Sequence, residues 1–157
     1  NKSMKKLLKQ ENEDSISNAG FDGGILYYNK ETNIVRYAGA QTPLFYIQND
    51  ELNMIKSNKH SIGYKKSDAS YQFTDYEIKI DTRTKIYIST DGYIDQNGGE
   101  KGFPFGKKRF QKSIEEIHNQ SFAEQKKSLQ DILENYQGKA ERNDDITVVA
   151  LDILCQH

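Results

Sequence analysis

The feature that most constrains the fold is a change of hydrophobic period along the chain. Residues 24–57 form four short segments rich in β-branched and aromatic side chains, separated by Asn, Asp, Gly and Pro, which is typical of a meander of antiparallel strands. Residues 71–80 alternate apolar and polar side chains, which predicts a strand with one solvated face. Residues 84–90 are more continuously apolar, as expected of a central strand.

The second half of the chain turns to a helical period. Apolar residues recur at i, i+4 and i+7 within residues 108–120, which predicts an amphipathic helix. Ser121 and Glu124 match the S-x-x-E capping box, so a second helix is expected to begin there and to end near Gly138. Residues 145–154 have strong β-propensity and predict a closing strand. This order of strands, two helices and a last strand predicts an α+β fold.

Size and charge limit the class of protein. The chain has 157 residues, of which 35% are hydrophobic and 29% charged, so we expect one soluble domain over residues 1–157. The formal net charge of −1 gives no overall field that would attract nucleic acid or an anionic membrane. No apolar run is long enough to span a bilayer or to form a signal peptide, so we expect a cytoplasmic protein without membrane contact from this segment. Cys155 is the single cysteine and is expected to be incidental.

Two aspartates stand next to predicted strands. Asp91 follows the strand at 84–90 in the sequence Ser-Thr-Asp-Gly, and Asp144 precedes the last strand in Asn-Asp-Asp-Ile. If these strands run antiparallel in one sheet, as two intervening helices permit, both carboxylates emerge at the same edge. A parallel pairing would place them at opposite ends of the sheet.

A same-edge pair of carboxylates suits a hard divalent cation. Mg²⁺ and Mn²⁺ prefer carboxylate oxygen and water, and such an ion can activate a water molecule and bind a phosphoryl group. The histidines at positions 60, 118 and 157 are scattered and no zinc-binding spacing is present. Asp-Gly is also a common turn dipeptide and Asn-Asp-Asp an ordinary loop, so spacing alone leaves both the metal and the turn interpretation open. Asp145 is expected to stabilise the turn or to support a ligand.

Four motifs in order resemble a known family. They are FDGGILYYNKETNIVRYAGAQTPLFYI, KIYISTDGYIDQ, FPFGKKRF and RNDDITVVALDI, which together extend over about residues 21–153. Their order and spacing resemble the C-terminal two-thirds of the SpoIIE-like branch of the PPM metal-dependent protein serine/threonine phosphatases.

The resemblance implies a fold and an activity. The fold is an antiparallel β-sandwich flanked by helices, the α-β-β-α arrangement of that family. Asp91 and Asp144 match its metal-binding aspartates, and the cofactor is Mn²⁺ or Mg²⁺, binuclear in the complete domain. The implied reaction is hydrolysis of phosphoserine or phosphothreonine by metal-activated water. The implied setting is bacterial signalling and sigma factor regulation, with a phosphorylated anti-sigma-factor antagonist as a possible substrate.

The chain departs from the family pattern at one place. The family's first part carries a further metal-binding aspartate and a Gly-His-Gly segment, and this sequence contains no Gly-His-Gly. The chain is therefore expected to be a truncated phosphatase domain that holds part of a metal site, with weak Mn²⁺ binding and poor activity. Unpaired sheet edges would favour a homodimer. The alternative is a degenerate phosphatase-like binding or regulatory module without catalysis.

Overall fold

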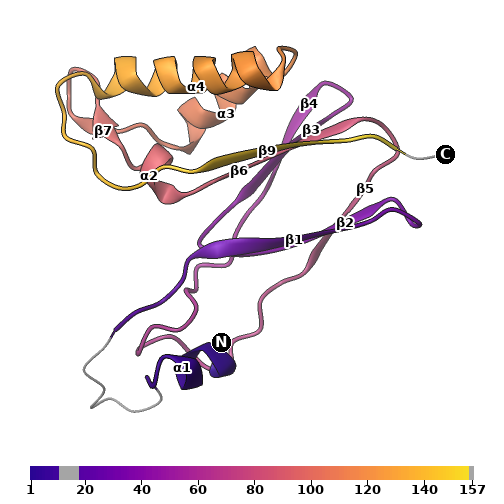
Figure 1. Cartoon of the computed structure of the whole chain (residues 1–157), viewed down its shortest axis with the longest axis vertical. Helices are drawn as coiled ribbons and strands as arrows, with labels where there is room; N and C mark the ends of the chain where they lie inside the picture. Colours follow the sequence, from indigo (N-terminus) through magenta and orange to yellow (C-terminus); the bar gives the residue numbers. More distant parts are fainter. Residues whose placement is uncertain (11–17, 156–157) are drawn as a thin grey trace. The chain divides into compact units, whose positions relative to one another are not determined.

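The computed structural model describes residues 1–10 and 18–155, and these residues form two compact units. The first unit comprises residues 1–44 and 55–79, and the second comprises residues 45–54 and 80–155 as far as they are described. Figure 1 shows the helices and strands of both units. Each unit is taken by itself below.

The first unit is built on a three-stranded antiparallel sheet. Its strands are β1 (Gly23–Asn29), β2 (Ile34–Ala40) and β5 (Tyr76–Lys79), in the order β1-β2-β5. A short helix, α1 (Lys2–Leu7), precedes them. Val35, Tyr37 and Ile78 are buried, whereas alternate β1 side chains such as Ile25 are exposed. The period-two pattern of the sequence is therefore retained in this sheet.

The second unit contains a four-stranded sheet in the order β4-β3-β6-β9. The strands are β3 (Leu44–Gln48), β4 (Glu51–Ile55), β6 (Thr84–Ser89) and β9 (Val148–Ile153). Asn49 and Asp50 both have positive φ, 53° and 61°, which matches the tight two-residue turn that joins β3 to β4. A small hairpin pairs β7 (Asn97–Gly98) with β8 (Phe103–Pro104).

Two helices pack on this four-stranded sheet. They are α3 (Lys107–Ile117) and α4 (Phe122–Gln137), which Figure 1 shows on one side of the sheet. Phe110 is fully buried and makes edge-to-face contacts with Phe45 of β3 and with Tyr93, with ring centroids 5.3 and 5.0 Å apart. These rings form the centre of the core of the second unit. The apolar stripe predicted for residues 108–120 is thus a packing surface.

Most of the predicted elements are confirmed. The α+β class with antiparallel sheets is correct, and α4 begins at a capping box in which the Glu124 N–H donates to Ser121 Oγ at 3.4 Å and the Ser121 N–H donates to Glu124 Oε2 at 2.9 Å. The strand predicted over residues 71–80 is shorter, because β5 starts only at Tyr76. Residues 97–104, for which the sequence predicted no strand, contain the β7–β8 hairpin. No helix in the described part of the chain is long and apolar enough to cross a membrane. The extent of the predicted single domain stays a prediction.

Candidate metal centre

The pairing of strands β6 and β9 determines where the two candidate aspartates lie. The strands are antiparallel, with Ser89 of β6 opposite Val148 of β9. Asp91 follows the end of β6 and Asp144 precedes the start of β9. In an antiparallel pair, the end of one strand lies beside the start of the other. Both aspartates therefore lie at the same end of this strand pair, as the antiparallel alternative predicted.

Asp91 opens a short helix. It is the first residue of α2 (Asp91–Ile94), and its carbonyl oxygen accepts a hydrogen bond of 2.7 Å from the backbone N–H of Asp95. The next residues, Gly92, Tyr93 and Ile94, are buried while Asp91 is exposed. The Tyr93 hydroxyl donates to the Leu129 carbonyl at 2.7 Å. Burial of α2 on its inner side thus fixes the backbone from which the Asp91 carboxylate extends.

A glycine brings the two aspartate-bearing segments into close contact. A Cβ atom built on Gly92 would lie 2.4 Å from the carbonyl oxygen of Asp145 and 3.3 Å from the carbonyl carbon of Asp144. No real side chain tolerates the shorter distance, so only glycine fits between these backbones. The Asp-Gly pair is therefore more than a turn signal, because the glycine lets the segment after Asp91 approach the segment at Asp144.

A buried glutamine and an asparagine hold the loop before Asp144. Gln96 is fully buried, and its Nε2 donates to the Glu141 carbonyl at 2.8 Å while its Oε1 accepts from the Asn143 N–H at 3.2 Å. The Asn143 Nδ2 donates to the Asp95 carbonyl at 2.7 Å. Sequence reasoning missed both residues. The signal that identifies Gln96 is its burial as a polar side chain near the helix that starts at Asp91-Gly92. Burial can be seen only in the structure.

Asp91 and Asp144 provide carboxylate oxygens, which are the ligands that a hard divalent cation prefers. They are only two residues. Both Asp91 and Asp144 are exposed, and Asp144 Oδ1 accepts a hydrogen bond of 2.7 Å from the Asp145 N–H. Neither forms an ion pair with any described residue. Within residues 1–10 and 18–155, no group of three or more His, Cys, Asp and Glu side chains could hold a metal ion. Carboxylate oxygens of this kind are the ligands that Mg²⁺ and Mn²⁺ prefer.

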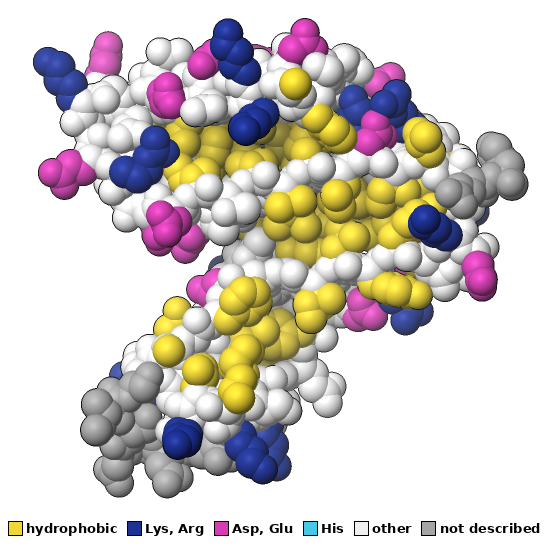
Figure 2. Space-filling view, in the orientation of Figure 1, with side chains coloured by type: hydrophobic (Ala, Val, Ile, Leu, Met, Phe, Trp, Pro, Cys, Tyr) yellow, Lys and Arg dark blue, Asp and Glu magenta, His cyan; other side chains and the backbone are white. Residues whose placement is uncertain are grey.

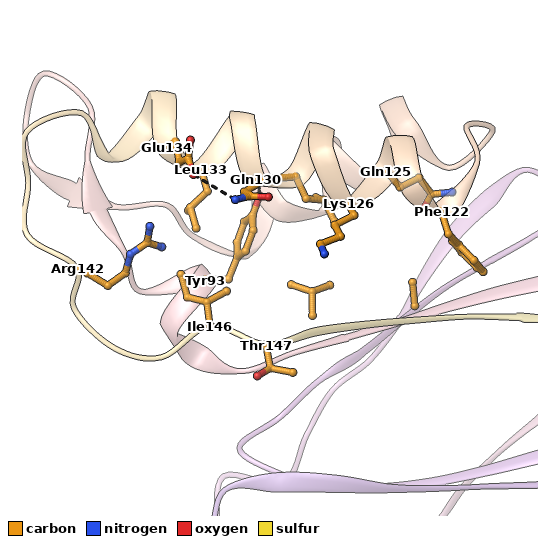
Figure 3. Close-up of a pocket in the computed structure, with 13 residues that line it drawn as sticks. Tyr93, Phe122, Gln125, Lys126, Gln130, Leu133, Glu134, Arg142, Ile146 and Thr147 are labelled. Carbon is orange, nitrogen blue, oxygen red and sulfur yellow. Dashed lines mark hydrogen bonds between the residues drawn. The ribbon is translucent and has the colours of Figure 1, made fainter.

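An open groove begins beside this end of the sheet. It has a volume of about 650 Å³ and lies between α4 and β9 (Figure 3). Ile146, Val148 and Ala150 line it on the strand side, and Leu129 and Leu133 line it on the helix side. Figure 2 shows exposed hydrophobic side chains between α4 and β9.

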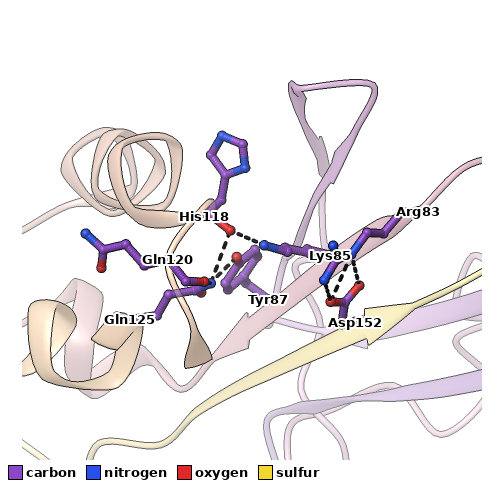
Figure 4. A network of polar contacts seen from close by, with 7 residues as sticks. All are labelled: Arg83, Lys85, Tyr87, His118, Gln120, Gln125 and Asp152. Carbon is purple, nitrogen blue, oxygen red and sulfur yellow. Dashed lines mark hydrogen bonds and ion pairs between the residues drawn. The ribbon is translucent and has the colours of Figure 1, made fainter. Parts of the chain in front are cut away.

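The opposite end of β6 is tied to the helices by polar contacts (Figure 4). The buried Tyr87 hydroxyl donates to Gln125 Oε1 at 3.0 Å, and burial raises the pKa of Tyr87 to about 12. The Lys85 ammonium donates to the His118 carbonyl at the end of α3. Arg83 forms a bidentate pair with Asp152 of β9, and this hydrogen bonding lowers the pKa of the Asp152 carboxyl. The Tyr87 and Lys85 contacts hold α4 and the end of α3 on the sheet, whereas the Arg83–Asp152 pair joins the residue before β6 to β9.

Solved structures share this arrangement and define the class as that of the PP2C phosphatase domains. The SiaA-PP2C domain of Pseudomonas aeruginosa is 25% identical, with a TM-score of 0.77, and the match covers 93% of this chain and 55% of that chain. The phosphatase domain of the cell fate determinant SpoIIE from Bacillus subtilis shares the fold at 12% identity, with a TM-score of 0.60, covering 98% of this chain and 74% of that one. A Mn-presoaked structure of the same domain gives a TM-score of 0.64 at 12% identity, covering 99% and 66%.

The family follows from the sequence itself. The family description "Stage II sporulation protein E (SpoIIE)" matches residues 1–154, and the chain belongs to the SpoIIE family. The chain spans about half the length of the SiaA-PP2C chain that it matches. A comparison with curated protein sequences finds no match.

Proposed function

We propose that this chain is the part of a metal-dependent phosphoprotein phosphatase that supplies two metal-binding carboxylates, Asp91 and Asp144. The observation that carries the proposal is their position at one end of the antiparallel pair β6–β9, in segments that pack against each other at Gly92. Family membership supports phosphatase chemistry, and the exposed, unpaired carboxylates support binding of Mn²⁺ or Mg²⁺.

The residues of this chain would orient the reactants. Asp91 extends from the fixed first turn of α2, and Asp144 from a loop held by Gln96 and Asn143. Rigid placement of ligands matters because a displacement of about 1 Å can cost about 100-fold in rate. When bound, Mn²⁺ or Mg²⁺ lowers the pKa of water and neutralises charge on a phosphoryl group. The proposed reaction is hydrolysis of phosphoserine or phosphothreonine on a bacterial signalling protein, with a phosphorylated anti-sigma-factor antagonist as one candidate substrate.

A second candidate is a phosphatase-like binding or regulatory module without catalysis. It is favoured by one observation: among the described residues, no group of three or more His, Cys, Asp and Glu side chains could hold a metal ion. The two candidates differ in what the aspartates do, because a module of this kind has no need of Mn²⁺.

The test is Mn²⁺ binding by the purified chain, measured by electron paramagnetic resonance of free Mn²⁺. We expect weak binding, with a dissociation constant on the order of 1 mM, because two carboxylates form only part of a binuclear site. Asp91→Asn and Asp144→Asn should each abolish this binding. Asp131→Asn, an exposed carboxylate on α4, is the matched control and should leave it unchanged. If the wild-type chain and all three variants bind Mn²⁺ equally, the metal-dependent phosphatase loses its support and the binding or regulatory module is favoured.

Turnover gives a separate readout. The chain alone should hydrolyse p-nitrophenyl phosphate slowly with Mn²⁺ present. Fast turnover by the chain alone that requires Asp91 and Asp144 would show that the site is complete and would contradict a partial site.

A further inference from the structure

Arg142 is the one basic residue in the two segments that carry the candidate metal ligands. Residues 91–95 and 141–145 contain five carboxylates and a single Lys or Arg, so their formal net charge is −4. The five acids are Asp91, Asp95, Glu141, Asp144 and Asp145. A phosphoserine group itself carries a charge of about −1.5 to −2 at pH 7. A phosphoryl group is therefore repelled by these segments unless cations offset their charge.

The backbone of Arg142 is held on both sides by one buried side chain. The Gln96 Nε2 donates to the Glu141 carbonyl at 2.8 Å, and the Gln96 Oε1 accepts from the Asn143 N–H at 3.2 Å, so these two hydrogen bonds flank Arg142. The Asn143 side chain in turn donates to the Asp95 carbonyl at the end of α2, at 2.7 Å. The Arg142 side chain thus extends from a fixed backbone, which a residue that orients a substrate requires.

The Arg142 guanidinium is available to a ligand. Arg142 is exposed and forms no ion pair with a described residue. In Figure 3 its side chain extends from the loop after α4 toward the groove that it helps to line. The other charged residues that line this groove are Lys126 and Glu134, and the Glu134 carboxylate accepts a hydrogen bond of 3.4 Å from the Gln130 amide. The lining of the groove therefore has a formal net charge of +1.

Arg142 also supplies a kind of hydrogen-bonding group that the aspartates lack. Ionised carboxylates only accept hydrogen bonds, and so do the oxygens of a phosphoryl group at high pH, so the two cannot pair directly. A guanidinium has five N–H donors in a planar fork that matches two phosphoryl oxygens. Arg142 lies two residues before Asp144, so their Cα atoms are at most about 7 Å apart. A long arginine side chain spans a separation of this size.

We propose that Arg142 binds the phosphoryl group of the substrate and so makes the site selective for phosphate esters. The inference rests on the proposed function, because it takes Asp91 and Asp144 as the metal ligands. It adds a residue that contacts the substrate to the two that contact the metal. The guanidinium stays protonated throughout and takes part in no covalent step.

The test is nuclear magnetic resonance of the full chain in excess Mg²⁺ at constant ionic strength. Inorganic phosphate or O-phosphoserine is added while the Nε–H signal of Arg142 is followed. We expect a saturable shift of this signal with both ligands and none with serine. Arg142→Gln should weaken phosphate binding about tenfold, measured from the phosphorus signal of the ligand, because it removes hydrogen bonds between charged groups. Arg142→Lys keeps the charge without the planar fork and should cause a smaller loss.

The matched control is Lys139→Gln, which removes a positive charge three residues before Arg142, at an exposed position that does not line the groove. It should leave phosphate affinity unchanged. The proposal is overturned if the Arg142 signal does not move, if Arg142→Gln binds phosphate as tightly as the wild-type chain, or if Lys139→Gln weakens binding equally.

Mn²⁺ binding separates this inference from the proposed function. Arg142→Gln should retain the Mn²⁺ binding of the wild-type chain, and its loss would mean that Arg142 only supports the loop. A wild-type chain that binds Mn²⁺ through Asp91 and Asp144 but binds no phosphate would overturn the role of Arg142 alone. Mn²⁺ binding that does not depend on these aspartates would overturn the proposed function itself.

Discussion

Thr90 and Thr147 exchange two hydrogen bonds across the end of the β6–β9 pair. The Thr90 N–H donates to the Thr147 carbonyl at 3.0 Å, and the Thr147 N–H donates to the Thr90 hydroxyl, also at 3.0 Å. Thr90 directly precedes Asp91, and Thr147 lies three residues after Asp144. These two hydrogen bonds therefore fix the distance along the sheet between the two candidate ligands. The Thr90 side chain makes one of the two bonds.

Thr90→Val should loosen this junction. Valine keeps the shape of threonine and removes the acceptor of the Thr147 N–H, so we expect a loss of about 1 kcal/mol in the free energy of unfolding. The Thr147 amide hydrogen should also exchange faster, which nuclear magnetic resonance can measure. Thr32→Val is the control, because only the backbone N–H of Thr32 is hydrogen-bonded. Equal losses in both variants would show that the Thr90 hydroxyl has no special role.

Gly92→Ala should disturb the contact between α2 and the loop at Asp144. The new methyl group would meet the Asp145 carbonyl oxygen at 2.4 Å, and a backbone atom there cannot move aside cheaply. We expect a loss of about 1–3 kcal/mol in urea unfolding, together with weaker Mn²⁺ binding.

Gly102→Ala separates crowding from backbone strain. Gly102 has a φ of 65° and open space around its Cβ position, so alanine there meets only the left-handed backbone cost. It should leave Mn²⁺ binding unchanged. If Gly102→Ala lowered Mn²⁺ affinity as much as Gly92→Ala, the close approach at Gly92 would not explain the effect.

Gln96→Leu should release the loop before Asp144. Leucine keeps the apolar volume but leaves the Glu141 carbonyl and the Asn143 N–H without their partner, which costs about 1–3 kcal/mol. Hydrogen exchange should rise within residues 141–145. Gln130→Leu, at an exposed position of α4, is the control for the same chemical change, because the Gln130 amide donates only to the exposed Glu134 side chain, at 3.4 Å. Unchanged exchange in the Gln96 variant would mean that Asn143 alone holds the loop.

Asp152→Asn should alter the acid dependence of stability. The hydrogen bonds from Arg83 lower the pKa of Asp152, so the folded state favours the carboxylate. This contribution is present above the unfolded pKa of about 3.9 and is lost as the pH falls through the lower folded value. Urea unfolding should therefore show wild type more stable than Asp152→Asn at about pH 7, with the difference shrinking as the pH falls below the unfolded value of about 3.9.

The local elements could be predicted because their signals are local. The capping box at Ser121 and Glu124 set the start of α4, and the apolar stripe that includes Phe110 and Ile114 gave the packed face of α3. The start of β5 was misplaced, because the alternation over residues 71–75 did not reveal that these residues form a loop. The hairpin β7–β8 was missed since each strand has only two residues, too few for any period.

The sequence by itself determined the order of the elements, the family and the two aspartates that could bind metal. It left open whether β6 and β9 run antiparallel, since strand direction depends on pairing between residues far apart in the chain. Only the tertiary structure decided that, through the register that sets Ser89 opposite Val148. It alone revealed Gln96, Asn143 and Gly92 as the residues that hold the aspartate segments together, because burial and close backbone approach arise from three-dimensional packing and leave no periodic mark on the sequence.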